Sequence, residues 1–125
     1  TQPNQFFLPH RAIVEGKFRV VYDGSAPDPS GRSLNSFLDA GPNMLPLLVE
    51  VLLRFRADPV ALQADCKAAF HHVLVPEGDR RFLQFLWQGH RYHWRTTPFG
   101  LSCSPYNLHQ ALKFILDGHG PPVAE

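Results

Sequence analysis

Proline and glycine do most to constrain what this chain can fold into. Twelve prolines and nine glycines are spread over 125 residues, and both residue types break helices and mark turns. The sequence therefore predicts many short elements joined by turns and excludes a bundle of long helices. The length fits one compact domain, and an apolar share of 44% is enough to form a core.

Charge and cysteine content exclude several broad classes of protein. The formal net charge of +1 provides no overall attraction for nucleic acid, so such a site would have to be local. The two cysteines, Cys66 and Cys103, are too few for a disulfide scaffold and predict a reduced, intracellular protein, cytoplasmic or nuclear. No apolar run is long enough to span a bilayer, so we expect no membrane partner.

The N-terminal part of the chain predicts two consecutive strands. Residues 11–16 form the first and residues 17–22 the second, where basic and apolar side chains alternate. This alternation puts Lys17 and Arg19 on one face of the second strand. Two cations on one face can hold phosphate groups, although an exposed edge kept soluble by its charge is the commoner arrangement. Both interpretations stay open at this point.

A loop and a helix are expected next. Residues 23–33 are rich in turn formers and predict a loop, and Ser33 is placed to cap a brief helical turn. Asn43 predicts the N-cap of a helix that runs to about Arg56, with Pro46 in its first turn. Because this helix is apolar around most of its circumference, we expect it to face the core.

The C-terminal half predicts a β-hairpin and a second helix. Two runs rich in aromatic residues, 82–87 and 91–95, are joined by a tight connection containing Gln-Gly. A Pro-Phe-Gly-Leu turn at residues 98–101 follows. Ser104 then predicts an N-cap, and the apolar spacing after it is that of an amphipathic helix ending at Gly118.

Between these parts, the stretch from Pro59 to Val75 is mostly apolar but has Asp65 in its middle. Val60–Ala64 predicts a short buried strand that ends at this carboxylate. A carboxylate in such a place must be paired, hydrogen-bonded or bound to a metal, because burying it alone is costly. Asp65 therefore either caps a turn or faces a functional site.

The other polar residues form no recognisable zinc or hydrolase motif. No Cys-x-x-Cys pair is present, and His71 and His72, as neighbours on a strand, would point to opposite faces. No strained nucleophile elbow surrounds Ser102 or Ser104. These patterns favour neither structural zinc nor Ser–His–Asp or Cys–His hydrolysis.

Several short motifs follow one another over nearly the whole chain. They are Phe7-Leu8-Pro9-His10, Phe18-Arg19-Val20-Val21-Tyr22-Asp23-Gly24-Ser25-Ala26, Ser33-Leu34-Asn35, Gly41-Pro42-Asn43, Leu52-Leu53-Arg54-Phe55-Arg56, Ala64-Asp65, Lys67-Ala68-Ala69-Phe70, Asp79-Arg80, Phe85-Leu86-Trp87 and Thr97-Pro98-Phe99-Gly100-Leu101-Ser102-Cys103-Ser104-Pro105. In this order the motifs resemble the fingers and palm of retroelement reverse transcriptases, most closely the BEL/Pao type of LTR retrotransposons.

The resemblance implies a fold, a cofactor and a set of partners. The fold would be α+β, a partial right-hand polymerase fingers/palm with short antiparallel strands, a hairpin and two or three helices. Residues 1–58 would be the fingers-like part and residues 59–125 the palm-like part. The implied partners are an RNA/DNA template-primer and a dNTP, and the implied cofactor is Mg²⁺.

The resemblance also implies roles for individual residues. Asp65 matches the first catalytic aspartate, whose carboxylate would hold Mg²⁺. The residues implied in nucleotide binding are Lys17 and Arg19 on the triphosphate, Phe70 as the steric gate against a ribose 2′-OH, and Phe99 and Gly100 in the turn lining the pocket. As a structural alternative, the two phenylalanines would be core aromatics and the glycine an ordinary turn residue.

One departure from the family pattern concerns the second catalytic motif. Reverse transcriptases carry two further aspartates in a Tyr-x-Asp-Asp type motif, and this sequence reaches Glu125 without one. One carboxylate cannot hold two Mg²⁺ ions, so we expect that this chain alone does not polymerise. In the family, the Asp65 strand pairs with the missing hairpin, which would leave Val60–Ala64 as an exposed apolar edge that needs a protein partner or the remainder of the chain.

Two functions therefore remain open from the sequence. The chain is either a segment of a working RNA-directed DNA polymerase, or a retroelement remnant used as a structural or interaction subunit of a larger assembly. Retention of Asp65, Phe70 and Arg19 favours recent descent from an active enzyme, whereas the absent motif favours the structural role.

Overall fold

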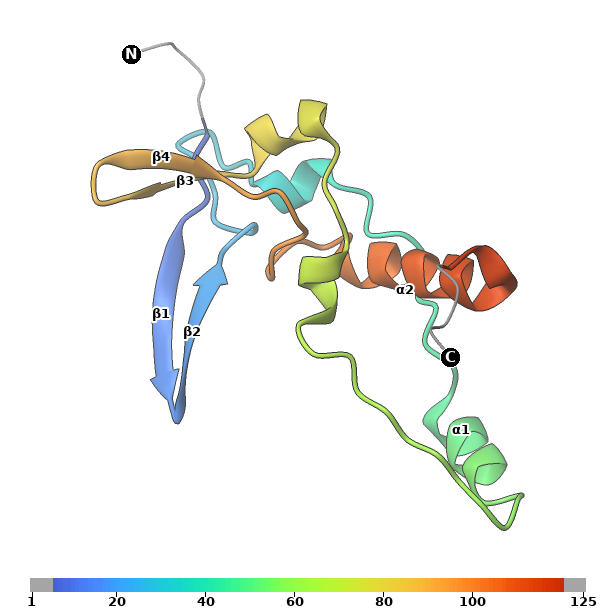
Figure 1. Cartoon of the computed structure of the whole chain (residues 1–125). Coiled ribbons are helices and arrows are strands. Elements are labelled where there is room, and N and C mark those ends of the chain that lie inside the picture. Colours follow the sequence, from blue (N-terminus) through green and yellow to red (C-terminus); the bar gives the residue numbers. More distant parts are fainter. Residues whose placement is uncertain (1–5, 121–125) are drawn as a thin grey trace.

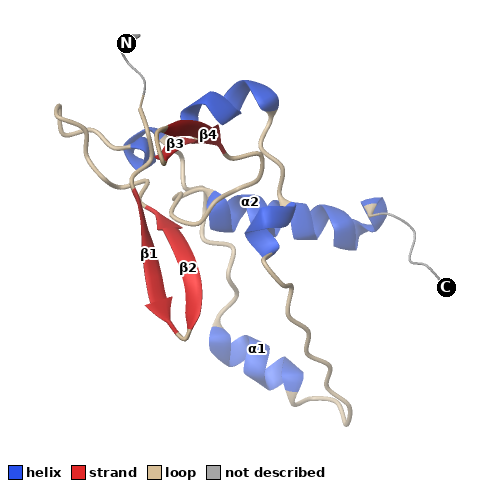
Figure 2. Cartoon of the chain, turned by 60° about the vertical axis from the view of Figure 1, so that its left-hand side comes forward, coloured by secondary structure: helices blue, strands red, loops and turns tan. Residues whose placement is uncertain are grey.

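The computed structural model describes residues 6–120 and shows a small α+β arrangement (Figure 1). Two antiparallel two-stranded sheets are separate from each other, and long loops join the elements (Figure 2). In chain order the elements are β1 (His10–Glu15), β2 (Lys17–Tyr22), η1 (Leu34–Phe37), α1 (Leu48–Phe55), η2 (Ala69–His72), η3 (Glu77–Phe82), β3 (Gln84–Trp87), β4 (His90–His93), α2 (Ser104–Phe114) and η4 (Ile115–His119).

The first hairpin, β1–β2, confirms the two predicted N-terminal strands. The strands pair from His10 opposite Tyr22 to Glu15 opposite Lys17, and Gly16 makes the turn with a φ of 73°. Glycine suits this position because a positive φ costs it little. The side chain of Lys17 lies outside the described part of the structure.

The second hairpin, β3–β4, confirms the other predicted pair of strands. Its connection has Gln88 at a φ of 49° and Gly89 at 77°. Positive φ at both central residues is the backbone of a tight hairpin whose twist matches the strands. The strands are shorter than the expected runs, covering residues 84–87 and 90–93.

A small core forms where the two hairpins meet. Its buried apolar members are Leu8, Tyr22, Val75, Leu83 and Leu101. The Tyr22 ring lies edge-on to Phe85 and Trp94, with ring centroids 5.1 and 5.2 Å apart. Such pairs add about 0.5–1.5 kcal/mol each beyond area burial, so this aromatic contact fixes the base of the first hairpin against the second.

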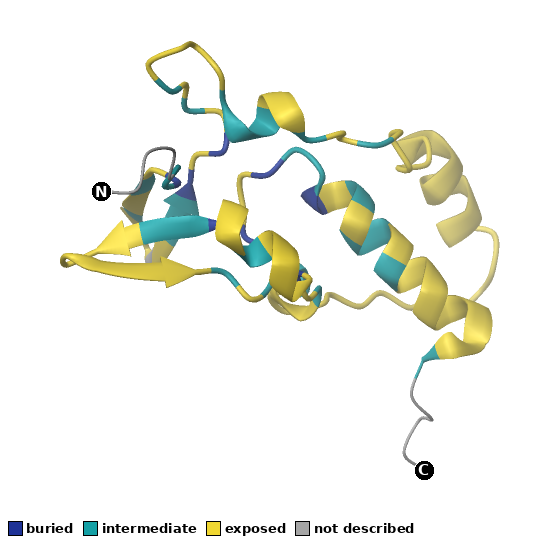
Figure 3. Ribbon diagram, turned by 90° about the horizontal axis from the view of Figure 1, so that it is seen from above, coloured by how far each residue is buried: buried dark blue, intermediate teal, exposed yellow. Residues whose placement is uncertain are grey.

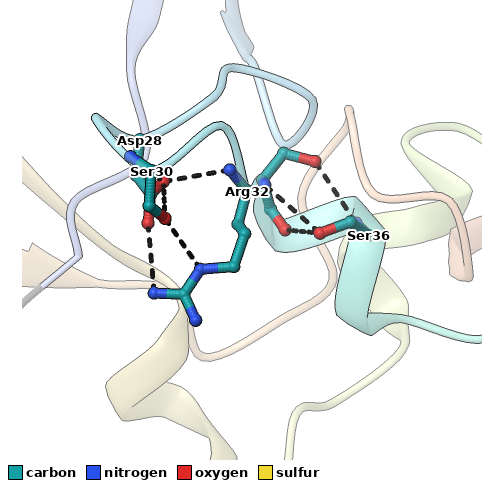
Figure 4. A network of polar contacts seen from close by, with 5 residues as sticks. Asp28, Ser30, Arg32 and Ser36 are labelled. Atoms are coloured by element: carbon teal, nitrogen blue, oxygen red, sulfur yellow. Dashed lines mark hydrogen bonds and ion pairs between the residues drawn. The ribbon is translucent and has the colours of Figure 1, made fainter.

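The loop of residues 23–33 is held by a carboxylate (Figure 4). Asp28 Oδ1 accepts from the Ser30 hydroxyl at 2.6 Å and from the Arg32 backbone N–H at 3.0 Å. The Ser30 hydroxyl, followed by the Arg32 N–H, lowers the pKa of Asp28. Beyond it, Ser33 caps η1 through a reciprocal capping box with Ser36, which confirms the expected helical turn.

The prediction of a core-facing helix that starts at Asn43 is wrong both about where the helix begins and about its burial. It begins at Leu48, while the Asn43 side chain accepts from the backbone N–H of Leu45 at 3.1 Å instead. The reason is Pro46, which disfavours a helical conformation at Leu45 and keeps the chain extended. No residue of α1 is buried, and Figure 3 shows the whole helix in the exposed class.

The predicted strand Val60–Ala64 is also wrong. The segment is extended but unpaired, and Val60 and Leu62 are 76% and 90% exposed. No described strand lies beside it to take its backbone hydrogen bonds, and without such a partner a strand is not stable. His71 and His72 likewise lie in the short helix η2 rather than on a strand.

The C-terminal helix is close to the prediction. The helix α2 begins at Ser104 with Cys103 at the N-cap, one residue before the expected cap, and Pro105 lies in its first turn. The following π-turn η4 contains Gly118 at a φ of 89°, as expected for a glycine that ends a helix. Between residues 6 and 120, no helix is both long and apolar enough to cross a membrane.

Candidate functional site

Phe70 and Phe99, two of the predicted site residues, are in contact. Their ring centroids are 5.1 Å apart at an interplanar angle of 89°, an edge-to-face pair. His71 lies beside them, 5.6 Å from the Phe99 ring and 5.3 Å from Trp94. Phe70 is half-buried and Phe99 is 46% exposed, so the pair lines a surface that a ring or sugar can reach.

The segment that contains Phe70 begins with an unusual backbone conformation. Ala68, the N-cap of η2, has φ 52° and ψ 41°, the left-handed region. A residue with a Cβ costs about 1–2 kcal/mol there. The helix is held by the His71 N–H donating to the Ala68 carbonyl at 2.8 Å, and the His72 ring nitrogen lies 3.2 Å from the Lys67 carbonyl.

Gly100 packs against the end of β2 so closely that no other residue fits. A Cβ at this position would lie 1.9 Å from the Tyr22 carbonyl oxygen, and the φ of Gly100 is 102°. On the neighbouring loop, a Cβ at Gly24 would lie 2.7 Å from the Gly100 carbonyl oxygen. The turn that carries Phe99 is therefore fixed to the C-terminal end of the strand that carries Arg19.

Asn35 ties the same turn to the loop after β2. Its Nδ2 donates to the Ser25 hydroxyl at 2.8 Å and to the Gly100 carbonyl at 3.0 Å, and its Oδ1 accepts from the Ser102 N–H at 3.0 Å. An amide carries both donors and an acceptor, so one side chain bridges two loops. Sequence reasoning missed this role; the available signal was an asparagine inside a short capped helical turn.

Two further predicted residues lie outside this cluster. Arg19 is exposed on β2, opposite Ile13. Asp65 is exposed in the unpaired segment before η2, and the described residues offer it no hydrogen bond or ion pair. The structure thus brings together Phe70, Phe99 and Gly100 and leaves the carboxylate and the cation apart from them.

The described residues do not fit the implied Mg²⁺ site. This ion requires about six oxygen ligands in near-octahedral geometry, usually with one or two carboxylates held in place. Nowhere in residues 6–120 do three or more His, Cys, Asp or Glu side chains group closely enough to hold a metal ion. Asp65 supplies one carboxylate and nothing beside it supplies a second.

A groove of about 1260 Å³ lies elsewhere, between the loop around η1 and residues 73–84. Its rims carry two cation–π pairs, with Arg32 5.8 Å from the Phe37 centroid and Arg81 4.7 Å from the Phe82 centroid. None of the predicted site residues lines it. The predicted nucleotide site is therefore not this groove.

Comparison with known proteins gives one kind of match. The chain is similar to the Transposon Tf2-3 and Transposon Tf2-4 polyproteins of Schizosaccharomyces pombe, with 26% identity over 110 residues in each case. The aligned region covers 88% of this chain but 8% of each polyprotein. No protein-family model and no solved structure matches the chain. The similarity supports a retrotransposon-derived region.

Proposed function

We propose that this chain is derived from the fingers and palm of a reverse transcriptase of the BEL/Pao type, whose parent activity is template-directed DNA synthesis from dNTPs. The motif order over nearly the whole chain supports this assignment, and the similarity to transposon polyproteins supports its coarser part, the retrotransposon origin. Because the aligned region is 8% of each polyprotein, the activity, substrates and partners of the parent protein are part of the proposal.

The observation that carries the proposal is the contact between Phe70 and Phe99 beside Gly100. These residues come from two distant segments, and the resemblance assigns all three to the pocket for the incoming nucleotide. In the proposed site, Phe70 lies against the sugar and excludes a 2′-OH, while Phe99 and Gly100 line the base. The resemblance assigns Arg19 and Lys17 to the triphosphate, for which a guanidinium is suited by its paired N–H donors.

The proposal includes a limit on activity. Asp65 is one carboxylate, and in-line phosphoryl transfer by a metal pair depends on several oxygen ligands held together. We therefore propose that the 125-residue chain does not polymerise by itself, and that further carboxylates have to be brought to Asp65.

Primer extension tests both parts of the proposal. On a primed RNA template the 125-residue chain should incorporate no dNTP; incorporation that Asp65→Ala abolishes would refute the limit on activity. The gene read past codon 125 should encode a Tyr-x-Asp-Asp motif within a few dozen residues.

In the longer polypeptide, Phe70→Ala should raise the use of rNTPs relative to dNTPs, and the control Phe37→Ala, at an exposed phenylalanine, should not. Unchanged sugar selectivity in Phe70→Ala would show that the nucleotide site is wrongly assigned.

A second function, a structural subunit of a larger assembly, is favoured by the exposed apolar segment around α1 and Val60–Ala64. Leu48, Leu53 and Leu62 are each at least 67% exposed. We propose that a partner protein or further polypeptide covers this segment, because exposed apolar surface of this kind associates. Light scattering should detect association of the isolated chain, and a stable monomer at high concentration would contradict this. A reading frame without the second motif would favour the structural role over the polymerase.

A further inference from the structure

The groove between the loop around η1 and residues 73–84 has an apolar lining. Its buried lining residues include Val75 and Leu83. Phe37 and Phe82 also line it and are 69% and 50% exposed. At about 1260 Å³ the groove is larger than the roughly 300–1,000 Å³ of a small-molecule pocket. It therefore fits a segment of polypeptide better than a small ligand.

The helix α1 has the size of this groove. An α-helix rises about 1.5 Å per residue and is about 10–12 Å wide with its side chains. The eight residues of α1 therefore occupy a cylinder of about 900–1,400 Å³, a range that includes the groove volume. Among the described residues that line the groove, none belongs to α1, and α1 lies apart from η1 in Figure 1.

The apolar surface of α1 is wide enough to need two walls. Successive residues are about 100° apart around a helix, so the apolar residues of α1 span an arc of about 200°, and Glu50 and Arg54 occupy the remainder. A flat surface covers about half of such an arc, whereas a groove covers most of it and leaves the charges in water. The exposed apolar residues are Leu48, Val49, Val51, Leu52, Leu53 and Phe55.

The charges beside the groove complement those of α1. Asp79 and Arg81 line the groove, Glu50 and Arg54 form the polar side of α1, and all four are exposed. Within residues 6–120, none of the four forms an ion pair. Each surface thus carries one carboxylate and one cation for the other, and docking buries no unpaired charge.

We propose that α1 of one copy of this chain docks in the groove of a second copy, and that the second copy docks its own α1 in the groove of the first. Such an exchange uses the same two surfaces on both copies and closes as a two-fold dimer. Residues 38–47 and 56–68, which connect α1 to the rest of the chain, contain no helix or strand and can carry it across. The proposal deepens the structural role proposed above and rests on its claim that a partner covers α1.

Buried area favours this reciprocal arrangement over a single contact. A 200° arc of an eight-residue helix has a surface of roughly 210–250 Å², so one docked helix buries about 450 Å² on the two surfaces together. Two such contacts bury about 900 Å², before the connecting segments with the exposed Val60 and Leu62 are counted. A specific interface buries at least about 1,000 Å² in total, which a single contact does not approach.

Cross-linking from the native cysteine in the groove tests the proposal. Cys103 lines the groove, and Cys66→Ser removes the exposed second thiol. In the full 125-residue chain with Cys66→Ser, Val51→Cys adds a thiol on the apolar arc of α1. A short bismaleimide should link this thiol to Cys103 of a second copy and give a covalent dimer on a denaturing gel. The matched control is Val14→Cys, at a 76% exposed valine near the tip of the first hairpin, and it should give none.

Sedimentation equilibrium measures the strength of the association. Leu52→Ala on α1 and Phe82→Ala in the groove each remove a side chain from both contacts of the dimer. A residue at the centre of an interface contributes about fivefold or more in affinity, so each variant should raise the dissociation constant at least about 25-fold. Leu86→Ala, at a 45% exposed leucine of β3 outside the groove, should leave it unchanged. Circular dichroism of each variant checks that the fold is retained.

Each outcome has a distinct meaning. A covalent dimer from Val51→Cys, with weaker association of Leu52→Ala and Phe82→Ala, would support the exchange. Equal dimer yield from Val14→Cys, a cross-link within one chain, or oligomers larger than a dimer would each overturn it. Association that Phe82→Ala leaves unchanged would assign α1 to another surface, which overturns this proposal and leaves the proposed structural role standing. A monomer at all concentrations would refute both.

Discussion

Replacing Gly100 by alanine should be among the most damaging small changes in this chain. The added Cβ would lie 1.9 Å from the Tyr22 carbonyl oxygen, whereas ordinary contacts begin near 3.4 Å, so the backbone would have to move by about 1.5 Å. Forcing extra volume into a packed site costs about 1–3 kcal/mol. A φ of 102° adds about 1–2 kcal/mol for a residue with a Cβ. We expect a loss of about 3 kcal/mol in the free energy of unfolding, within a range of about 2–5.

Urea denaturation followed by tryptophan fluorescence measures this loss. With a slope of about 1–3 kcal/mol per molar urea, the midpoint for Gly100→Ala should fall by about 1–3 M. The matched control is Gly31→Ala, because Gly31 also has a positive φ, 82°, but nothing within 4 Å of an added Cβ. It should lose only the backbone cost of about 1–2 kcal/mol. If the two variants are equally stable, the close approach of Gly100 to Tyr22 is not a constraint and the reasoning fails.

Three further predictions concern the same region. Asn35→Ala removes three hydrogen bonds and should cost about 2–3 kcal/mol in urea denaturation; a cost below 0.5 kcal/mol would show that water replaces them. A double-mutant cycle of Phe70→Leu and Phe99→Leu should give a coupling of about 0.5–1.5 kcal/mol, and zero coupling would contradict the edge-to-face contact. Burial raises the pKa of Tyr22 above 10.0 and of Cys103 above 9.0, so the folded state holds protons that the unfolded state loses. Thermal stability should therefore fall as the pH rises through 9 and 10; a flat profile would refute this.

Local chemistry explains which elements were predictable from the sequence. The β3–β4 hairpin follows from its Gln-Gly connection, because a two-residue turn determines the pairing of the strands beside it. The cap at Ser33 is equally local. The N-cap signal at Asn43 does not start α1, because Pro46 disfavours a helical conformation at the preceding residue and keeps the chain extended up to Leu48.

Contacts between distant segments were not predictable in the same way. Periodicity showed that α1 is apolar but could not show whether another element covers it, and none of its residues is buried. The resemblance gives Phe70 and Phe99 roles in one nucleotide pocket, but their ring contact is a finding of the structure, because no sequence pattern specifies a contact between these two segments. The bridge at Asn35 depends on the close approach of two loops, which an isolated asparagine does not reveal.

The accessible surface of the chain is larger than that of a compact monomer, and the uncovered part includes both α1 and the segment that carries Asp65. The chain has 10683 Å² of accessible surface at a mass of 14.1 kDa, whereas a compact monomer of this mass has about 6,700 Å². The excess of about 4,000 Å² is several times the 800 Å² that each partner buries in a standard interface, so a small transient contact cannot cover it. Asp65 is on the same uncovered segment as Val60 and Leu62. We therefore expect Asp65 to take a fixed position relative to Phe70 only when that segment is packed against another surface, because no hydrogen bond or ion pair to another described residue holds the carboxylate.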